Sequence, residues 1–384
     1  MMVRTHEVYA AGEPRILLIK TRGRSTVERR ERQLRESSGA EPRSLLFEDT
    51  LHCDVLDENT IQNTGGFRAH IYRRLPGFAA QAFEAARLSR SYDVVITWSE
   101  RHSVAVAALF AILRIRTPHL AMMFWLSKPA VRWPLRLART GIDRIVTWSS
   151  IQRSVAIEQI GFRPDDVVLV RHPVDLEFFK PVDSEREIIF SAGSTQRDFP
   201  TFADAVRGLD VPVHIAASLV VALDGYKIIT RDVRDEPGWP ENCQVGPLTS
   251  VELRDAYAAA KMVVVPLLPT DIDAGVNVIL EGMAMGRPVI VSQTKGQVDV
   301  VHDGETGVFV PTEDSSALRS RMESFLADPE AAEEMGRRGR AYVEQHHRLE
   351  DFIDHVRSNV LELSARPSRR NFWSRRSGVP VKSS

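Results

Sequence analysis

Residues 270–292 read TDIDAGVNVILEGMAMGRPVIVS, and their pattern predicts the fold of the domain around them. We expect an acidic loop, then a helix that begins at Gly275 and ends near Gly286, then a short apolar strand over residues 288–291. A loop, a helix and a strand in this order are typical of nucleotide-binding α/β domains. The segment therefore predicts such a domain in this half of the chain.

Two acids flank the predicted start of this helix. Asp273 precedes the helix, and Glu281 lies on it two turns further along. The backbone N–H groups of Gly275, Val276 and Asn277 are expected to be free, and a helix N-terminus of this kind binds phosphate. Because carboxylates accept hydrogen bonds from sugar hydroxyls, a phosphate site between two acids favours a nucleotide sugar as the ligand.

The alternative is an ordinary buried helix that Asp273 caps. Glu281 argues against it, because Glu281 lies among Val278, Ile279 and Leu280, and an unpaired acid is rarely buried. We therefore interpret both acids as functional.

These residues also carry a family resemblance. Residues 273–290, DAGVNVILEGMAMGRPVI, resemble the Glu-x7-Glu signature of the retaining glycosyltransferase family 4 (glycosyl transferases group 1), whose fold is GT-B. The resemblance implies that Asp273 contacts the donor sugar and that Glu281 holds the ribose. Asp273 is one carbon shorter than the family's Glu, and a misplacement of about 1 Å can cost on the order of a hundredfold in rate. The substitution suggests a different donor sugar or a weaker activity.

A second marker opens the C-terminal domain. Residues 188–205 predict a strand that runs into Gly193, a polar loop and a helix that starts near Pro200. A glycine lets a ligand approach the backbone, and an arginine in the loop can grip phosphate. Arg197 matches the lysine that clasps the diphosphate in the resembling family, whereas Ser194 replaces the family's first arginine. The alternative for Arg197 is a solvated loop residue.

Weaker markers lie on either side. Residues 171–181 resemble the family element that enters the hinge, where Asp175 can cap a turn. In residues 244–266 the resemblance implies that backbone near Leu248 faces the nucleobase. Backbone contacts of this kind leave the base itself undetermined.

The N-terminal half alternates strands and helices. We expect strands at residues 15–20, 93–98, 118–124, 142–148 and 167–170, with helices at 26–37, 67–89, 102–115 and 151–160. The loop after the first strand holds Gly23 alone, so a Gly-x-Gly-x-x-Gly dinucleotide site is absent. His102 stands at the mouth of the second of these strands, where it can line a cleft. The alternative for His102 is a helix cap or a surface residue.

The fold class that follows is α/β, GT-B, with two Rossmann-like doubly wound domains that face a central cleft. The predicted parts are residues 1–180 (acceptor-binding domain), 181–348 (nucleotide-sugar-binding domain), 349–365 (a helix that crosses back to the first domain) and 366–384 (a basic tail expected to be disordered). Strands in residues 211–216 and 227–231 continue the second domain.

Composition narrows the functional class. The chain has 384 residues. Its formal net charge of -1 indicates no nucleic-acid partner, and its 2 cysteines indicate neither a disulfide framework nor a zinc site. No apolar run is long enough to cross a bilayer, and the N-terminus lacks a signal-peptide pattern, so we expect a cytoplasmic protein. The tail cations, with Trp125, Lys128, Arg132, Trp133, Arg136 and Arg139, make an anionic membrane surface on the inner face a candidate partner. Solvated surface is the alternative.

The predicted activity is glycosyl transfer with retention, from a nucleoside diphosphate sugar to a hydroxyl of a glycan, a lipid-linked sugar or a small molecule. We expect no cofactor and no metal, because Asp273 of the Asp271-x-Asp273 pair already matches the family acid and the helix dipole can replace a cation. The alternatives are a nucleotide-sugar epimerase, a phosphorylase or a non-catalytic nucleotide-sugar-binding protein. The predicted catalytic residues are Asp273, Glu281, Arg197 and His102, and the predicted donor-binding residues are Gly193, Ser194, Arg197, Leu248, Asp273, Ala274, Gly275, Val276, Asn277 and Glu281.

Overall fold

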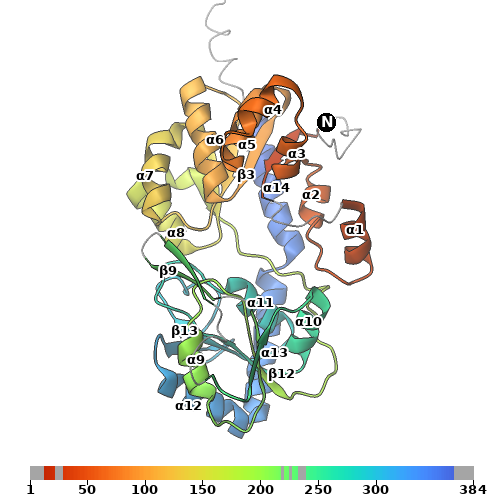
Figure 1. Ribbon diagram of the computed structural model, residues 1–384, viewed down its shortest axis with the longest axis vertical. Coiled ribbons are helices and arrows are strands. Elements are labelled where there is room, and N and C mark those ends of the chain that lie inside the picture. The colour runs from red at the N-terminus through yellow and green to blue at the C-terminus, as the bar shows by residue number, and fades with distance from the viewer. Residues whose placement is uncertain (1–12, 22–28, 218–219, 225–226, 232–238, 367–384) are drawn as a thin grey trace, which may run out of the picture.

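The structure, a computed structural model, describes residues 13–21, 29–217, 220–224, 227–231 and 239–366. Two lobes stand one above the other, and each is built on a six-stranded parallel sheet (Figure 1). The basic tail predicted at residues 366–384 lies outside the described residues from position 367 on.

The N-terminal lobe follows from buried apolar strands with helices between them. Its sheet has the order β2-β1-β3-β4-β5-β6, with β1 Ile16–Ile19, β2 Asp54–Leu56, β3 Val94–Trp98, β4 His119–Met122, β5 Arg144–Thr147 and β6 Val167–Leu169. The helices are α1 Arg29–Ser37, α2 Leu46–Thr50, α3 Glu58–Gln62, α4 Gly66–Tyr72, α5 Gly77–Leu88, α6 Glu100–Leu113, α7 Pro129–Ala138 and α8 Ser150–Ser154, which continues as a π-helix over Val155–Ile160. Helices cover both faces of this sheet, which explains why its strands can be apolar on both sides.

Of two local predictions for secondary structure, one was wrong and the other was confirmed in its bounds. The single helix expected at residues 67–89 is two helices, α4 and α5, because Pro76 donates no hydrogen bond and takes an extended ψ of 142° as the N-cap of α5. The strand expected at residues 227–231 forms as β10 Lys227–Arg231. It pairs with β9 Val220–Asp224 in an antiparallel hairpin and does not join the parallel sheet.

The C-terminal lobe has the strand order β11-β8-β7-β12-β13-β14. Its strands are β7 Ile188–Ala192, β8 Val213–Ala216, β11 Cys243–Gly246, β12 Ala260–Val265, β13 Val289–Gln293 and β14 Val308–Pro311, and its helices are α9 Phe199–Val206, α10 Ser250–Ala258, α11 Val276–Ala284, α12 Ser315–Ala327 and α13 Pro329–His346. The chain winds outward in both directions from β7 and β12. The carboxyl ends of these two neighbours form the topological switch point, where open α/β sheets bind ligands.

Residues of β12 alternate between two cores. Val263 and Val265 pack with α11 and α13 on one face, whereas Met262 and Val264 pack with α9 and α12 on the other. This alternation fixes the height and rotation of α11 over the sheet. The N-terminus of α11 is thereby held at the carboxyl edge, beside the switch point.

The last helix returns to the first lobe, as predicted. In α14 Leu349–Ala365, the side chains of Phe352, Ile353, Val356, Val360 and Leu363 join the core that also holds strands β1 and β3. The chain therefore crosses between the lobes twice, and the two crossings are side by side, because Val174 donates from its N–H to the carbonyl oxygen of His347 at 2.8 Å. The two passages act together as the hinge.

We predict that α14 stabilises the N-terminal lobe through its buried side. Replacing the fully buried Leu363 by alanine should lower the free energy of unfolding by about 2–5 kcal/mol, because it removes packed methyl groups and leaves a cavity. The matched change Leu361→Ala, on the same helix at 43% exposure, should cost about 0.5 kcal/mol or less. Urea denaturation followed by circular dichroism measures both, and equal losses would contradict the packing described.

Candidate functional site

The site lies where two loops meet at the carboxyl edge of the C-terminal sheet. One loop follows β7 and the other follows β12. They are joined by backbone hydrogen bonds from Asp198 to Pro266 at 3.1 Å and from Leu268 to Gln196 at 3.0 Å. These two hydrogen bonds link the loops directly at the switch point, so the loops form one structural unit.

Arg197 occupies the centre of this unit. The residue is 3% exposed, and its guanidinium donates from Nε to the carbonyl oxygen of Ala192 at 2.9 Å and from Nη1 to that of Thr195 at 3.0 Å. Burial lowers its pKa to about 10, while Tyr257 and Glu281 act in the opposite direction. The side chain therefore stays cationic at neutral pH in a place with little water, which strengthens its attraction for an anion.

Two glycines make room for this guanidinium. Gly193 has φ +83°, and a Cβ there would lie 2.7 Å from Arg197 Nη2. Gly275 has φ +86°, and a Cβ there would lie 3.2 Å from Arg197 Nη1 and 2.7 Å from Val265 Cγ1. Any larger residue at either position would press on the arginine. Gly193, Arg197 and Gly275, predicted as donor-binding residues from two separate motifs, are thus brought into contact.

Glu281 lies on α11 and reaches toward the same centre. Its Oε2 accepts a 2.7 Å hydrogen bond from the hydroxyl of Tyr257, which is fully buried against Phe190 and Phe179. Burial raises the pKa of Glu281 to about 7, although the Tyr257 hydrogen bond and the charge of Arg197 lower it in part. The carboxylate is therefore held in one orientation beside the arginine, with its second oxygen left for a ligand.

Asp273 is the second acid of the site. Its Oδ2 is buried without a hydrogen-bond partner among the described residues. Burial raises its pKa to about 7, and repulsion by Asp299 adds to the effect. A buried acceptor left without a partner costs about 1–3 kcal/mol, so the arrangement suits a group that a ligand completes.

One of the expected free N–H groups at the start of α11 is not free. The N–H of Val276 donates to the carbonyl oxygen of Asp273 at 3.2 Å, because the chain closes a turn there before the helix begins. The prediction for Val276 was therefore wrong in that respect, and its side chain is buried in the core. Asn277 is exposed at the lobe interface, where its Oδ1 meets Nε2 of His172 from the hinge.

The remaining donor-side residues lie around the same edge. Ser194 is half-buried in the loop after β7, and Leu248 follows β11 and packs at the rim of the core. Ala274 is buried, and its carbonyl oxygen accepts from Nε2 of Gln297 at 2.6 Å. Gln297 and Tyr257 were not predicted, because a single buried glutamine or tyrosine gives no periodic signal in a sequence.

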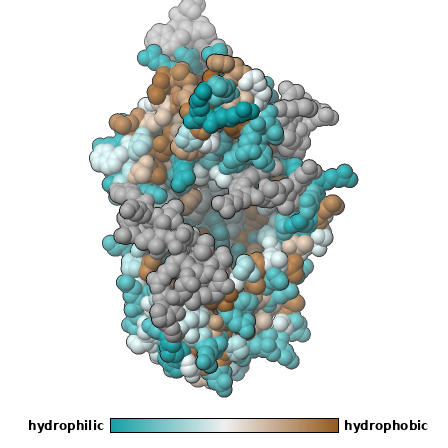
Figure 2. Space-filling view, in the orientation of Figure 1, coloured by the Kyte–Doolittle hydropathy of each residue, from teal (hydrophilic) through white to brown (hydrophobic). Residues whose placement is uncertain are grey.

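The loop after β12 faces the N-terminal lobe. Gln152 of α8 donates from Nε2 to the carbonyl oxygen of Asp271 at 2.9 Å, and Ser150 donates from its N–H to Asp299 at 2.8 Å. The surface between the lobes is hollowed (Figure 2). The switch point of the second lobe therefore opens toward the first.

His102 is placed differently from a ring that lines a cleft. It is 3% exposed at the start of α6, with Nδ1 bonded to the Ser99 hydroxyl at 2.8 Å and Nε2 to Gln81 Oε1 at 2.9 Å. Gln81 in turn donates to the carbonyl oxygens of Lys20 and Leu56, which follow or end β1 and β2. The alternative of a surface residue is also excluded. His102 ties together the carboxyl edge of the N-terminal sheet.

Within the part of the chain that the structure describes, no group of three or more His, Cys, Asp or Glu side chains is placed to hold a metal ion. The same residues include no helix that is long and apolar enough to span a membrane.

Comparison with known proteins relates this lobe to a described family. Residues 188–328 match the family described as glycosyl transferases group 1, a range that contains Arg197, Asp273 and Glu281. The chain is 26% identical over 202 residues to the putative glycosyltransferase EpsD of Bacillus subtilis, covering 52% of this chain and 46% of that protein. It is 24% identical over 226 residues to a D-inositol 3-phosphate glycosyltransferase of Streptomyces scabiei, covering 53% of this chain and 50% of that protein. The chain thus spans about half the length of the curated relatives it matches.

The architecture extends beyond the aligned region. The crystal structure of Anabaena HepE in complex with UDP and glucose superposes with a TM-score of 0.66 over 91% of this chain and 100% of that one, at 15% identity. The fold is therefore GT-B, as the sequence predicted.

We predict that Gly275 is needed for the geometry around Arg197. Gly275→Ala should displace the guanidinium and lower stability, because the new methyl group meets Val265 and Arg197 in addition to the strained φ. The matched control is Gly304→Ala, where φ is +76° and nothing lies within 4 Å, so only the backbone strain of about 1–2 kcal/mol applies. Thermal melting compares the two, and an equal loss would contradict the close approach at Gly275.

We also predict a pH dependence for Asp273. The pKa of an aspartate is about 3.8 in the unfolded chain, whereas the pKa of Asp273 in the folded protein is about 7. Between these two values the unfolded state releases the proton more readily, so the folded state loses stability as the pH rises. The loss is absent below about pH 4 and complete above about pH 7. Asp273→Asn should therefore gain stability relative to the native chain as pH rises from 4 to 8.

Melting temperatures across that pH range measure the effect. Asp314, the half-buried N-cap of α12, is a control of opposite sign, because the Ala317 N–H and the Ser316 hydroxyl lower its pKa and stabilise the ionised form. Asp314→Asn should lose stability relative to the native chain as the pH rises. A pH-independent difference for Asp273→Asn would contradict the burial of this carboxyl group.

Proposed function

We propose that the chain is a retaining glycosyltransferase of family 4, which moves a sugar from a nucleoside diphosphate sugar in the C-terminal lobe to an acceptor hydroxyl at the N-terminal lobe. The observation that carries the proposal is the buried cation of Arg197 between Gly193 and Gly275, with Glu281 close enough to act on its charge and the buried Asp273 two residues before Gly275. A buried cation and two buried acids at one edge of a Rossmann-like sheet fit a ligand that carries both phosphate and hydroxyl groups.

Each residue has a role in this proposal. Arg197 and the N-terminus of α11 would neutralise the diphosphate as it leaves. Glu281, oriented by Tyr257, would accept hydrogen bonds from the ribose, and Asp273 would accept them from the donor sugar. Leu248, Ala274 and the loop after Gly193 would line the base and phosphates.

The transfer itself needs no further base. The bond between the anomeric carbon and the terminal phosphate oxygen breaks, and the acceptor oxygen forms its bond to that carbon from the same face. The acceptor proton passes to the departing phosphate, so atoms and charge balance with the nucleoside diphosphate as product. His102 would act by holding the carboxyl edge of the N-terminal sheet, because both of its ring nitrogens are bonded within the lobe.

Several features extend the proposal beyond the donor. The named relatives support a small hydroxyl compound or a surface polysaccharide precursor as the acceptor class, since one is called a D-inositol 3-phosphate glycosyltransferase and another a capsular polysaccharide biosynthesis glycosyltransferase. We propose that no metal takes part and that the protein acts in the cytoplasm.

We predict that one nucleotide series stabilises the protein. The thermal shift should be measured with UDP-, GDP-, ADP- and dTDP-sugars, since a ligand at a hundred times its Kd adds about 2.7 kcal/mol. With Arg197→Ala or Glu281→Ala, the ligand concentration needed for the same thermal shift should rise tenfold or more, because each substitution removes a buried polar contact. Arg337→Ala and Glu305→Ala, both exposed in the same lobe, serve as matched controls that leave the shift unchanged.

The product distinguishes the remaining functions. Retaining transfer predicts release of the nucleoside diphosphate only with an alcohol acceptor, an unchanged anomeric configuration by NMR and full activity in EDTA. Turnover without an alcohol would indicate an epimerase, and turnover with phosphate a phosphorylase. Binding without any turnover across the acceptor panel would contradict an enzymatic role.

A further inference from the structure

We propose that helix α7 carries a docking surface for a bilayer that contains anionic lipids. The surface consists of Lys128, Arg132, Trp133, Arg136 and Leu137, which we call the α7 surface. It belongs to the N-terminal lobe and shares no residue with the site described above. The proposal therefore does not depend on the function proposed for that site.

Helix α7 is apolar on two sides. Val131, Leu135 and Ala138 are buried in the lobe, as expected of a helix that packs on a sheet. Trp133 and Leu137, four residues apart and so on one face, are 57% and 87% exposed. A tryptophan and a leucine on the polar side of a helix are typical of helices that lie at a membrane interface.

The cations of the α7 surface lie against tryptophan rings. The guanidinium carbons of Arg132 and Arg136 each lie 5.9 Å from the ring centre of Trp133, and Lys128 Nζ lies 5.0 Å from that of Trp125. A hollow of about 280 Å³ lies between Arg132, Trp133, Arg136, Glu158 and Gln159. The charges are therefore held beside the exposed ring, at the level where lipid phosphates lie around an inserted tryptophan.

Among the described residues, neither Arg132 nor Arg136 forms an ion pair, although Glu158 borders the same hollow. Arg132 donates to Gln159, a neutral side chain, and α7 itself contains no aspartate or glutamate. On other helices, some arginines are paired within their own helix, as Arg319 is with Glu323 and Arg340 with Glu344. The α7 surface thus keeps its charge for an external partner.

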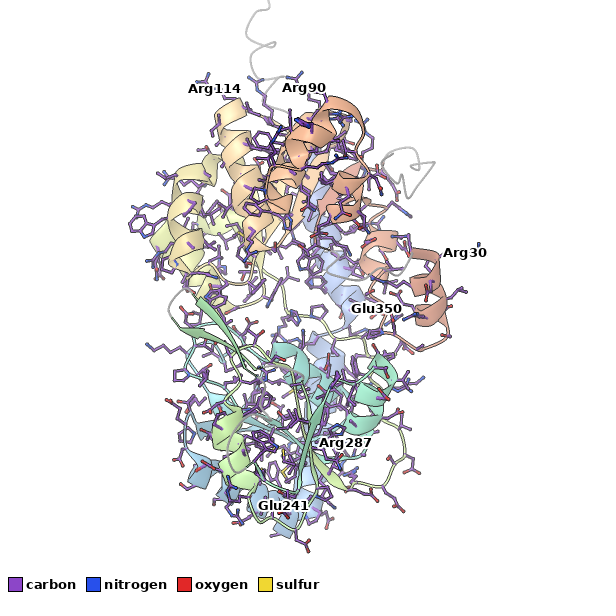
Figure 3. The ribbon with its side chains drawn as sticks, viewed as in Figure 1. Arg30, Arg90, Arg114, Glu241, Arg287 and Glu350 are labelled. Atoms are coloured by element: carbon purple, nitrogen blue, oxygen red, sulfur yellow. The ribbon has the colours of Figure 1, made fainter. Side chains whose placement is uncertain are left out.

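The neighbouring end of α6 has the same character. Residues 101–142 contain no acid, and their cations are Arg101, Arg114, Arg116, Lys128, Arg132, Arg136 and Arg139. At the outer end of α6, which packs against α7, Ile112 is 75% and Leu113 57% exposed. Arg114 lies at this end, away from the C-terminal lobe (Figure 3), and hydrophobic residues gather over the same part of the lobe (Figure 2). A bilayer at this face would leave the surface between the lobes open.

The charge and the exposed apolar side chains of the α7 surface together indicate which partner binds it. A second copy of the chain would place Arg132 and Arg136 against like charges in a two-fold contact, which is unfavourable. A nucleic acid would use the cations but gain nothing from Leu137. An anionic bilayer satisfies both, because its phosphates pair with the arginines and its interface takes the two apolar side chains.

The test is flotation of the full chain with vesicles of phosphatidylcholine containing increasing phosphatidylglycerol. We expect binding that rises with phosphatidylglycerol and falls with salt. Arg132→Gln with Arg136→Gln should lower the partition coefficient about thirtyfold, since each cation near an anionic surface contributes about fivefold. Trp133→Ser with Leu137→Ser should lower it about tenfold or more by removing the inserted area. Arg132→Lys with Arg136→Lys should restore most of the binding.

Two control variants isolate the α7 surface. Arg337→Gln with Arg338→Gln removes two charges from α13, and four substitutions at Arg369, Arg370, Arg375 and Arg376 neutralise the tail, which lies outside the described residues. Neither should change flotation more than about twofold, and melting temperatures verify that every variant is folded. Absence of native binding at low salt, loss of binding with the tail variant alone, or concentration-dependent dimerisation through Trp133 would overturn the proposal.

Discussion

The candidate site depends on one buried cation. The Arg197 side chain donates to two backbone carbonyl oxygens, and its guanidinium packs against Gly193 and Gly275, where a side chain would collide with it. The loops after β7 and β12 therefore pack together around this guanidinium. A buried charge is tolerated only when hydrogen bonds and an opposite charge surround it. Glu281 lies close enough to raise the pKa of Arg197 against the effect of burial. A phosphate group at this point would complete the neutralisation.

The two carboxyl groups show what this arrangement costs the free protein. Burial raises the pKa of both Asp273 and Glu281 to about 7, so at neutral pH each is divided between its two protonation states. Strongly shifted pKa values of this kind are common at functional sites. Tyr257 limits the shift at Glu281 by donating to it, whereas Asp273 faces the repulsion of Asp299 and has a buried oxygen without a partner. The two acids are thus adapted to different contacts.

The two lobes are connected by ion pairs as well as by the two crossings of the chain. Arg43 of the first lobe bonds Asp175 in the hinge through both its N–H and its side chain, and it also pairs with Glu350 at the start of α14. Burial alone would raise the pKa of Asp175, but the hydrogen bonds from Arg43 lower it below its usual value. Because Asp175 also accepts from the N–H of Glu177, it caps the turn as the sequence predicted. Arg43 therefore bonds residues of both crossings of the chain.

The sequence by itself determined the alternation of strands and helices, the two-lobed fold and the order of the motifs around Gly193 and Gly275, because these follow from local periodicity and from glycine and proline. It also indicated Arg197, Asp273 and Glu281, since charged residues inside apolar runs stand out. Only the tertiary structure decided that Arg197 lies between those two glycines, that Tyr257 orients Glu281, that the Val276 N–H is used in a turn and that His102 is bonded at both nitrogens. Most of these contacts join residues far apart in the chain, whereas the turn at Val276 and the bond from His102 to Ser99 are local. The strength of all of them depends on burial, which a local pattern does not record.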